Sequence, residues 1–355
     1  MSTPETTLHC KSSEIANPLD DDSWDDRILV HAKATIFHTS AWARVLNGAF
    51  GYKPFYFCTT KGDQLATCLP VMEIDSWLFG RRGKTLPFTD YCELLDTEKA
   101  ESRQLLDEVL DFGRSRKWKS YEMRGGTDVS ESVVAHRTCY SHTVRLEQDV
   151  DQVFARFRGS TRRNIRRAIN CGVQVQYHDS LESIKAYYRL HCITRKRQGH
   201  FTQPFVLFRK IHEEIISKGN GFLSLALFNG RPIAGAIFFH ANGHAFYGYG
   251  ASDKSFQHLR PNNLLIWRAI QRYTELDCHE LDLGITDDGN NGLRRYKNGM
   301  ATTERTVHYY KYDFRQSEFI NHNTSLLNDL RIATGKKLPT AVLNAAGTLL
   351  YKHHG

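Results

Sequence analysis

The sequence has neither a long hydrophobic run nor closely spaced cysteines. Its 355 residues include eight cysteines, and no two of them lie closer than ten positions. Without a C-x-x-C pair, a zinc knuckle and a dithiol redox pair are excluded. No segment approaches the roughly 18 apolar residues of a membrane span, and the polar N-terminus carries no signal core. We expect a cytoplasmic protein with reduced thiols.

Several catalytic motifs are also missing. His212-Glu213-Glu214 lacks the second histidine of H-E-x-x-H, which excludes a zinc metalloprotease of that type. The sequence contains no G-x-S-x-G, no Walker loop and no G-x-G-x-x-G. Its 17 histidines do not group at metal-ligand spacing. We therefore expect no metal site and no tightly bound cofactor.

The composition is that of a globular protein long enough to form two domains. Hydrophobic residues make up 41% of the chain and charged residues 24%. The formal net charge is +8, which favours anionic partners but carries no information about fold. We expect a phosphorylated small-molecule or lipid-linked partner, with tRNA as a further candidate partner, and no DNA.

The most unusual stretch is an arginine-rich segment over residues 154–173. It holds six arginines, and no acidic residue occurs between Asp151 and Asp179. Ser160 is a suitable N-cap, Ile165 and Ala168 share one face, and Gly172 fits a helix C-terminus. Clustered like charges repel by a few tenths of a kcal/mol at helical spacing. The segment predicts a helix whose polar face either binds an anion or is simply solvated.

The order of residues in this segment resembles a known family. Thr161-Arg162-x-Asn164-Ile165-x-x-Ala168-x-x-x-Gly172-Val173 is similar to the T-R-x-N-I-x-x-A-x-x-x-G-V signature of the Fem family of peptidyltransferases. Related acyltransferase-like proteins occur in cell-envelope and exopolysaccharide systems. The resemblance implies an α/β (α+β) fold of tandem GNAT-like domains with mixed sheets flanked by helices. It also implies that Arg162, Arg163 and Asn164 contact the substrate.

The order of expected elements agrees with two such domains. We expect a loosely packed lead-in over residues 1–30, domains over 31–150 and 151–320, and a helical tail over 321–355. In the first domain, patterns predict a helix at 40–50, a hairpin over 55–74, a strand at 85–91, a helix at 105–118 and strands near 121–124 and 138–146. In the second, they predict helices at 181–198 and 204–217, a three-strand meander with two Asn-Gly turns, a helix at 262–275 and strands at 279–285 and 303–312. The tail either docks on a domain, which we favour, or makes peripheral membrane contact.

A second segment carries the candidate catalytic residue. Gly292 to Gly299 (GLRRYKNG) resembles the G-L-x-x-F-K-x-x-(F/W)-G segment of Fem proteins, with Tyr296 as the aromatic residue and a candidate substrate contact. The spacing departs from the family pattern after Lys297, where a single residue precedes the glycine. The resemblance implies that Lys297 stabilises the developing oxyanion during acyl transfer. A solvated lysine among basic neighbours is the alternative.

Further candidates come from the first domain and from the meander. Leu86 to Tyr91 (LPFTDY) resembles the L-P-F-x-D-Y segment of exopolysaccharide-associated Fem-like proteins, which implies that Asp90 and Tyr91 face the cleft between domains. Tyr249 alternates with glycines, where a ligand can approach closely, although a core role fits equally well. Asp282 either binds a substrate amine or pairs with an arginine.

The identity of the acyl donor is left open between aminoacyl-tRNA and acyl-CoA. Ordinary acetyltransferases of this fold hold the coenzyme A pyrophosphate on a glycine-rich loop before a helix. The corresponding stretch here, residues 255–263, has no glycine, and Pro261 removes a backbone donor. Asn263 is a candidate donor contact, whereas Arg260 and Asn262 fit equally well as helix caps.

Two classes of function follow. The first is an enzyme that transfers an acyl or aminoacyl group to an amine, or a hydroxyl, of a cell-envelope or exopolysaccharide precursor. The second is a non-catalytic binding module of the same fold that recognises a nucleotide-sugar or RNA through the arginine helix. A structural role in envelope assembly is a third possibility.

Overall fold

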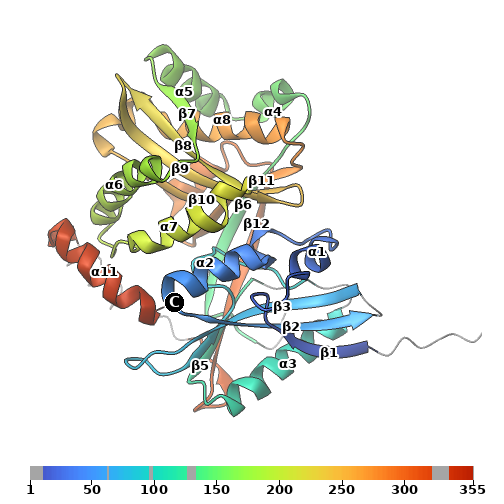
Figure 1. Ribbon diagram of the computed structural model, residues 1–355. Helices are drawn as coiled ribbons and strands as arrows, with labels where there is room; N and C mark the ends of the chain where they lie inside the picture. The colour runs from blue at the N-terminus through green and yellow to red at the C-terminus, as the bar shows by residue number, and fades with distance from the viewer. Residues whose placement is uncertain (1–10, 62–63, 96–98, 126–132, 322–335, 355) are drawn as a thin grey trace, which may run out of the picture.

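A computed structural model describes residues 11–61, 64–95, 99–125, 133–321 and 336–354. Its strands form one 13-stranded mixed sheet with helices on both faces (Figure 1). The strands are β1 (Lys11–Ala16), β2 (Lys53–Lys61), β3 (Gln64–Ile74), β4 (Arg82–Lys84), β5 (Ser120–Arg124), β6 (Arg137–Arg145), β7 (Gln174–His178), β8 (Gly221–Phe228), β9 (Arg231–Ala241), β10 (His244–Ser252), β11 (Glu280–Asp287), β12 (Thr303–Asp313) and β13 (Glu318–Phe319). The main helices are α1 (Trp24–Leu29), α2 (Ser40–Phe50), α3 (Lys99–Ser115), α4 (Val150–Arg156), α5 (Gly159–Asn170), α6 (Leu181–Gln198), α7 (Phe205–Glu214), α8 (Pro261–Glu275), α9 (Asn291–Lys297) and α11 (Thr340–His354).

Each half of the chain contains one parallel strand pair joined by a helix. In the first half β4 and β5 are parallel, with α3 between them in sequence. In the second half β10 and β11 are parallel, with α8 between them. The neighbouring strands are antiparallel, which gives the mixed sheet that the sequence predicts. The fold therefore repeats one α/β plan twice.

Two strands join the halves into one sheet. These two strands are β6 and β12, and the strand order across the middle of the sheet is β5, β12, β6, β11. β6 from the first half therefore lies between two strands of the second half. β12 in turn pairs with β5 of the first half. The sheet is thus continuous between the two halves. The expected domain boundary near residue 150 stays a prediction.

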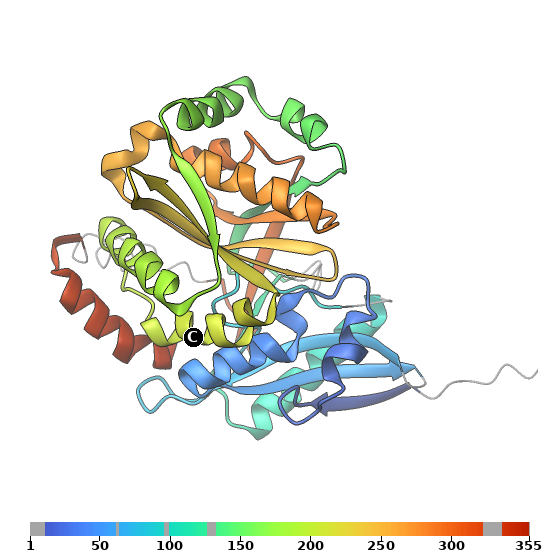
Figure 2. The same ribbon diagram turned by 45° about the horizontal axis from the view of Figure 1, so that its top comes forward.

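Three hydrophobic cores form layers along this sheet. The central core is shared by both halves: Trp42 of α2 and Phe208 of α7 belong to it, as does Phe239 of β9. Phe238, the residue before Phe239 on β9, belongs instead to the core under α8, because side chains alternate between the two faces of a strand. A third core lies under α3. Figures 1 and 2 show α2 and α7 side by side between the two halves.

Several expectations about local structure are confirmed. The helix at 40–50 is α2, the hairpin is β2 and β3, and the helix at 181–198 is α6. Both Asn-Gly turns connect antiparallel strands, and all four turn residues have positive φ. Gly172 ends the arginine helix with φ +80°. These are the features whose signals lie close together in sequence.

Other expectations need correction. The lead-in is not loosely packed from residue 11 onward, since β1 pairs with β2 and Trp24 of α1 is fully buried. Residues 85–91 do not form a strand, because Leu86 and Phe88 have positive φ (24° and 67°) beside Pro87. Ser160 does not cap α5. The helix begins at Gly159, and the preceding Arg158 N–H donates to Gly299 O at 2.9 Å.

The C-terminal helix α11 docks on both halves, which was the favoured expectation for the tail. Tyr351 O accepts from the Tyr52 hydroxyl of the first half at 2.7 Å. The Tyr351 hydroxyl donates to Phe201 O at 3.1 Å in the second half. The expected tail begins at residue 321, and its residues 322–335 lie outside the described part. No helix within the described ranges combines the length and apolarity needed to cross a bilayer.

Candidate active site

The candidate site lies where β10 and β11 separate. Their pairing ends at Phe246 and Asp282, although both strands continue beyond that point. The antiparallel ladders on either side are irregular at the same level: between Tyr247 and Tyr249 on β10, and between Asp282 and Ile285 on β11. Bulges of this kind turn strands away from each other and redirect side chains. They open the sheet here.

A pocket of about 220 Å³ occupies one side of this opening. The floor is formed by the end of β10 together with Leu283 of β11. Its walls come from α6, α8 and α9, and its lining residues are Thr194, Arg197, Gln198, Tyr247, Gly250, Ala251, Ser252, Gln257, Asn262, Ile266, Leu283, Leu293, Tyr296 and Lys297. Thr194 and Arg197 donate hydrogen bonds to Ser252 O, both at 3.1 Å, and so fix α6 against β10. We call this the large pocket.

Lys297 lies at the inner end of α9 and is only 7% exposed. Its Nζ donates to Ile285 O at 2.7 Å, which holds the ammonium group against the irregular part of β11. Burial lowers the pKa of the Lys297 ammonium group, whereas the carboxylates of Asp90, Asp282 and Asp287 act in the opposite direction. Lys297 is therefore a buried side chain that lines a pocket, and not the solvated lysine of the alternative interpretation.

A second, small pocket of about 30 Å³ lies on the other side of β11. Asp282 lines the small pocket and the next residue, Leu283, lines the large one, since neighbouring strand residues point to opposite faces. Besides Asp282, the small pocket is lined by Phe37, Phe88, Thr89, Asp90, Tyr91, Phe239, Phe246, Tyr247, Gly248, Tyr249 and Gly284. Tyr247 lines both pockets, and Lys297 Nζ is 3.7 Å from where a Cβ on Gly284 would lie. The two pockets thus approach each other beside Lys297.

The first half contributes Asp90 and Tyr91 to the small pocket. Asp90 Oδ2 accepts from the Ile285 N–H at 2.9 Å, and the Tyr91 hydroxyl donates to Asp282 Oδ2. The segment that carries them holds two bulky residues at positive φ, which costs energy unless its surroundings impose it. Hydroxyl groups of Tyr249 and Tyr309 donate to the carbonyl oxygens of Phe88 and Asp90. Tyr249 therefore anchors this segment as well as lining the small pocket.

Asp282 is almost completely buried at the floor of the small pocket, with 4% exposed. Ser141 Oγ donates to its Oδ2 at 3.1 Å, and the Gly284 N–H donates to its Oδ1 at 2.5 Å. Burial raises the pKa of Asp282, and the hydrogen bonds from Tyr91 and Gly284 lower it. Its partners are hydroxyl and amide groups, so the expected arginine pair is not its arrangement here.

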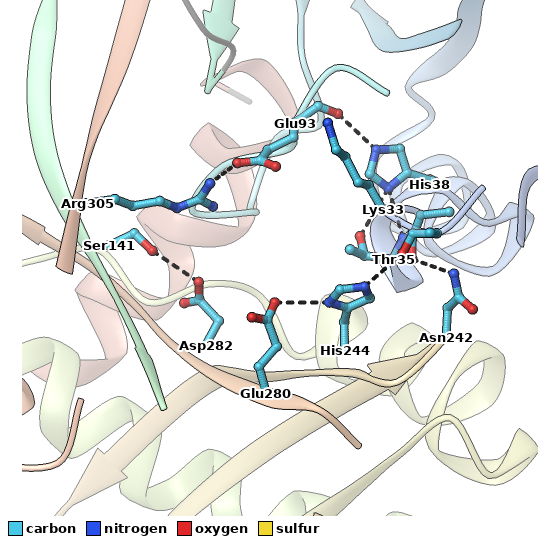
Figure 3. Close-up of polar contacts among 12 residues, drawn as sticks. Lys33, Thr35, His38, Glu93, Ser141, Asn242, His244, Glu280, Asp282 and Arg305 are labelled. Carbon is cyan, nitrogen blue, oxygen red and sulfur yellow. Dashed lines mark hydrogen bonds and ion pairs between the residues drawn. The ribbon is translucent and has the colours of Figure 1, made fainter. Parts of the chain in front are cut away.

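Polar side chains surround the region next to Asp282, as Figure 3 shows. Glu280, two residues before Asp282 on β11, pairs with His244 Nδ1 at 2.9 Å. His244 Nε2 lies 3.0 Å from Ala32 O. Each ring nitrogen therefore faces a hydrogen-bond acceptor, one in the second half (Glu280) and one in the first (Ala32). Glu93 and Arg305 form an ion pair on the opposite side. Elements of both halves therefore contribute charged groups beside the small pocket.

The arginine helix touches the segment 292–299, which carries the candidate catalytic residue, but does not line either pocket. Arg158 N–H bonds to Gly299 O, and a Cβ on Gly299 would lie 2.5 Å from Thr161 Oγ1. Gly299 is thus required for α5 to approach the segment after Lys297. Arg162 and Asn164 are half-buried and Arg163 is exposed, and none is among the residues lining the two pockets described above.

The stretch expected to contact the donor is compact. Residues 254–259 form a 3₁₀ helix, and Arg260 precedes α8 with φ +60°. The Asn263 N–H donates to Arg260 O at 3.2 Å, and its side chain is 5% exposed. Asn262 lines the large pocket, whereas Asn263 is not among its lining residues. The backbone here turns back on itself and offers no glycine-lined cradle.

Sequence reasoning missed two contributors to the site. Gly284 has φ +76°, and a Cβ there would lie 2.3 Å from Asp90 Oδ2. An isolated glycine within a strand pattern signals a bulge, and this signal was present in Leu-Gly-Ile. Arg197 comes from a basic run at the end of α6 whose spacing shows nothing distinctive. Only the packing of α6 on β10 brings it to the pocket.

Comparison with known protein families agrees with this geometry. Residues 155–298 match the family model described as an acetyltransferase (GNAT) domain. The match extends from the end of α4 into the residue after Lys297 and includes the whole of β10, α8, β11 and α9. No curated protein sequence matches the chain.

Solved structures show a similar fold over most of the chain. FemX superposes with a TM-score of 0.64 at 13% identity, over 90% of this chain and 99% of that chain. The C-terminal domain of a putative lysylphosphatidylglycerol synthetase from Agrobacterium fabrum gives 0.54 at 10%, over 90% and 96%. A tandem GNAT protein from the clavulanic acid biosynthesis pathway gives 0.52 at 8%, over 85% and 98%. At these identities the likeness shows the fold alone.

The comparisons confirm the two broadest expectations. Residues 155–298 match an acetyltransferase domain of the GNAT type, and the fold over most of the chain is similar to the Fem-like, tandem GNAT arrangement. The separation of β10 from β11, the large pocket and Lys297 all lie within or at the edge of the matched domain.

Proposed function

We propose that this acyltransferase transfers an acyl or aminoacyl group to an amine, or less readily a hydroxyl, of a cell-envelope or exopolysaccharide precursor in the cytoplasm. The observation that carries the proposal is the position of Lys297, a buried ammonium group at the place where two pockets approach each other. An acyl transfer needs a donor site, an acceptor site and, between them, a group that stabilises the oxyanion, such as a cation. The arrangement offers all three.

The large pocket is the proposed donor site. Its polar lining, which includes Arg197, Gln257 and Asn262, suits the polar end of an activated ester or thioester. With the donor carbonyl beside Lys297, the ammonium group donates a hydrogen bond to the carbonyl oxygen as that oxygen gains negative charge. A fixed donor of this kind contributes about 2.7–4 kcal/mol to transition-state stabilisation.

The small pocket is the proposed site of the acceptor amine. Aromatic rings line it, and Asp90 and Asp282 supply carboxyl groups, a combination that attracts an ammonium group. Once deprotonated, the amine nitrogen forms a bond to the donor carbonyl carbon, and the leaving oxygen or sulfur departs with its electron pair. Asp90 is exposed, so it can accept the released proton and pass it to solvent.

The donor we favour is aminoacyl-tRNA. A coenzyme A pyrophosphate needs closely approaching backbone N–H groups, whereas here Arg260 turns the chain, Pro261 has no N–H, and the Asn263 N–H is already bonded. The arginines of α5, of which Arg162 is half-buried and Arg163 exposed, would contact the phosphates of tRNA or of a lipid-linked acceptor outside the pockets.

Ligand binding and transfer test this proposal in two steps. A thermal-shift screen against aminoacyl-tRNA, a coenzyme A thioester and a UDP-linked sugar should identify the donor, because a ligand at 100 times its Kd adds about 2.7 kcal/mol. A donor that shifts the melting temperature is then incubated with amine acceptors. Stabilisation together with amide formation supports the proposal. Stabilisation without transfer to any acceptor would favour the binding-module alternative, and no stabilisation at all would contradict both.

A further inference from the structure

A cluster of large apolar side chains projects from the turn between β3 and β4. Trp77 is 85% exposed, and the adjacent Leu78 and Phe79 are 45% and 43% exposed. The other four tryptophans, at positions 24, 42, 118 and 267, are at most 7% exposed. Exposed aromatic and aliphatic side chains that occur together on a surface mark an interaction site.

The C-terminal helix extends this cluster. Trp77 Nε1 donates to His353 Nε2 at 3.1 Å, and Arg82 donates to His353 O, so the end of α11 lies against the turn. Leu349 is 71% exposed and stands one helical turn before His353, on the same face. Val342, two turns earlier, is 45% exposed. Residues 77–79 with Val342 and Leu349 are called the apolar patch below.

Basic side chains border the apolar patch. Lys119 lies against the turn, with its Nζ 2.9 Å from where a Cβ on Gly80 would be. Arg82 lies 5.5 Å from the centre of the Phe79 ring, and Lys352 is exposed on α11 beside His353. Asp75, the acidic residue at the start of this turn, is paired with Arg81 at 3.3 Å. The border is therefore positively charged, and we call it the basic rim.

We propose that the apolar patch and the basic rim dock on the surface of an anionic lipid bilayer, with Trp77 inserted at the level of the headgroups. The apolar side chains project from a turn and from one face of a helix, which suits insertion into a soft surface. An amphipathic surface of this kind binds a bilayer by burying its apolar residues while its cations attract acidic headgroups. Tryptophan suits that boundary because one edge of its ring is polar.

The same helix connects the apolar patch to the candidate active site. Tyr351 of α11 packs on Phe88, with ring centres 5.6 Å apart, and Phe88 lines the small pocket. A bilayer bound at the patch would therefore lie on the side of the molecule where α11 meets the segment that carries Asp90. Membrane docking does not depend on the proposed function, and it is measured without donor or acceptor.

Vesicle binding of the full chain tests the proposal. The probes are vesicles of phosphatidylcholine with and without phosphatidylglycerol, followed by co-sedimentation and tryptophan emission. Vesicles that contain phosphatidylglycerol should bind the chain, shift the emission to shorter wavelength, and quench it when the lipid is brominated. Because Trp77 alone is widely exposed, Trp77→Phe should abolish the emission change.

Two sets of variants separate lipid insertion from other causes. Leu78→Ser with Leu349→Ser should abolish co-sedimentation, and Lys119→Glu with Lys352→Glu should weaken it at least about tenfold. Val30→Ser and Lys185→Glu, exposed residues of the same types elsewhere, are the matched controls and should bind like the wild type. Absence of binding to the anionic vesicles overturns the proposal. So does self-association without vesicles that the Leu78→Ser, Leu349→Ser variant loses, since the patch would then be an interface between copies of this chain.

Discussion

Replacing Gly284 by alanine should break the contact by which Asp90 of the first half binds β11 at the candidate active site. Gly284 has φ +76°, a conformation that costs an alanine about 1–2 kcal/mol. The new Cβ would also lie 2.3 Å from Asp90 Oδ2, which is too close for both atoms to remain. Asp90 must then move and lose its hydrogen bond from the Ile285 N–H.

The expected loss of stability follows from these two effects. A hydrogen bond to a charged group contributes about 1.5–3 kcal/mol, and the lower value applies here because water can solvate the exposed Asp90. Together with the backbone strain, the free energy of unfolding should fall by about 3 kcal/mol. Acyl transfer should slow as well, because Asp90 would no longer face the small pocket.

A matched control lies five residues further along the chain, in the turn after β11. Gly289 has φ +89° and no heavy atom within 4 Å of a built Cβ, so Gly289→Ala tests the strain without the collision. Urea denaturation should show a loss of only the strain, about 1–2 kcal/mol, for this variant. In an Asp90→Ala background, Gly284→Ala should become as mild as Gly289→Ala. If the two glycine variants are equally destabilised in the wild-type background, the inferred contact between Asp90 and Gly284 is wrong.

Three further changes have defined outcomes. Gly299→Ala places a Cβ 2.5 Å from Thr161 Oγ1 and should lower the melting temperature, with partial rescue by Thr161→Ala, whereas Gly292→Ala, which meets nothing within 4 Å, should not lower it. The hydrogen bond to Glu280 raises the pKa of His244 in the folded protein above its value near 6.5 in the unfolded chain. The pair therefore stabilises the fold at a pH below about 6.5, and this stabilisation is lost as the pH rises through the pKa of the folded protein. Denaturant titrations of His244→Asn should therefore show a larger deficit at about pH 5.5 than at about pH 8.5, and an equal deficit would contradict the assignment. Tyr249→Phe removes the hydroxyl group that bonds to Phe88 O and should reduce the free energy of unfolding by about 1 kcal/mol and slow transfer, and a wild-type rate would show that this anchor is dispensable.

The parts of the fold that could be predicted depend on signals between near neighbours in sequence. The Asn-Gly turns required positive φ at Asn229 and Asn242, and both residues adopt it. The apolar spacing over residues 181–198 defined α6 at both ends. The position of β6 between β11 and β12 could not be predicted, because its pairing partners lie more than 130 residues away in sequence.

The candidate site was predictable to the extent that a family resemblance marked its residues. Lys297 and Tyr296 were singled out by the segment 292–299, and Asp90 and Tyr91 by LPFTDY. The contacts of Asp90 and Tyr91 with β11 join residues about 190 positions apart, which no local pattern encodes. The roles of Arg162 and Arg163 stay predictions, since both lie on α5 outside the two pockets.

The most direct test of the account is single-turnover transfer by Lys297→Met, with Lys185→Met as the surface control. Methionine keeps the unbranched shape of the buried side chain up to its last carbon and removes the terminal nitrogen, with its charge and hydrogen bond. The account predicts that the variant binds its donor as the wild type does, while the transfer step slows by about 10²–10³. Transfer at the wild-type rate would contradict the claim that the Lys297 ammonium group stabilises the negative charge on the reacting carbonyl oxygen.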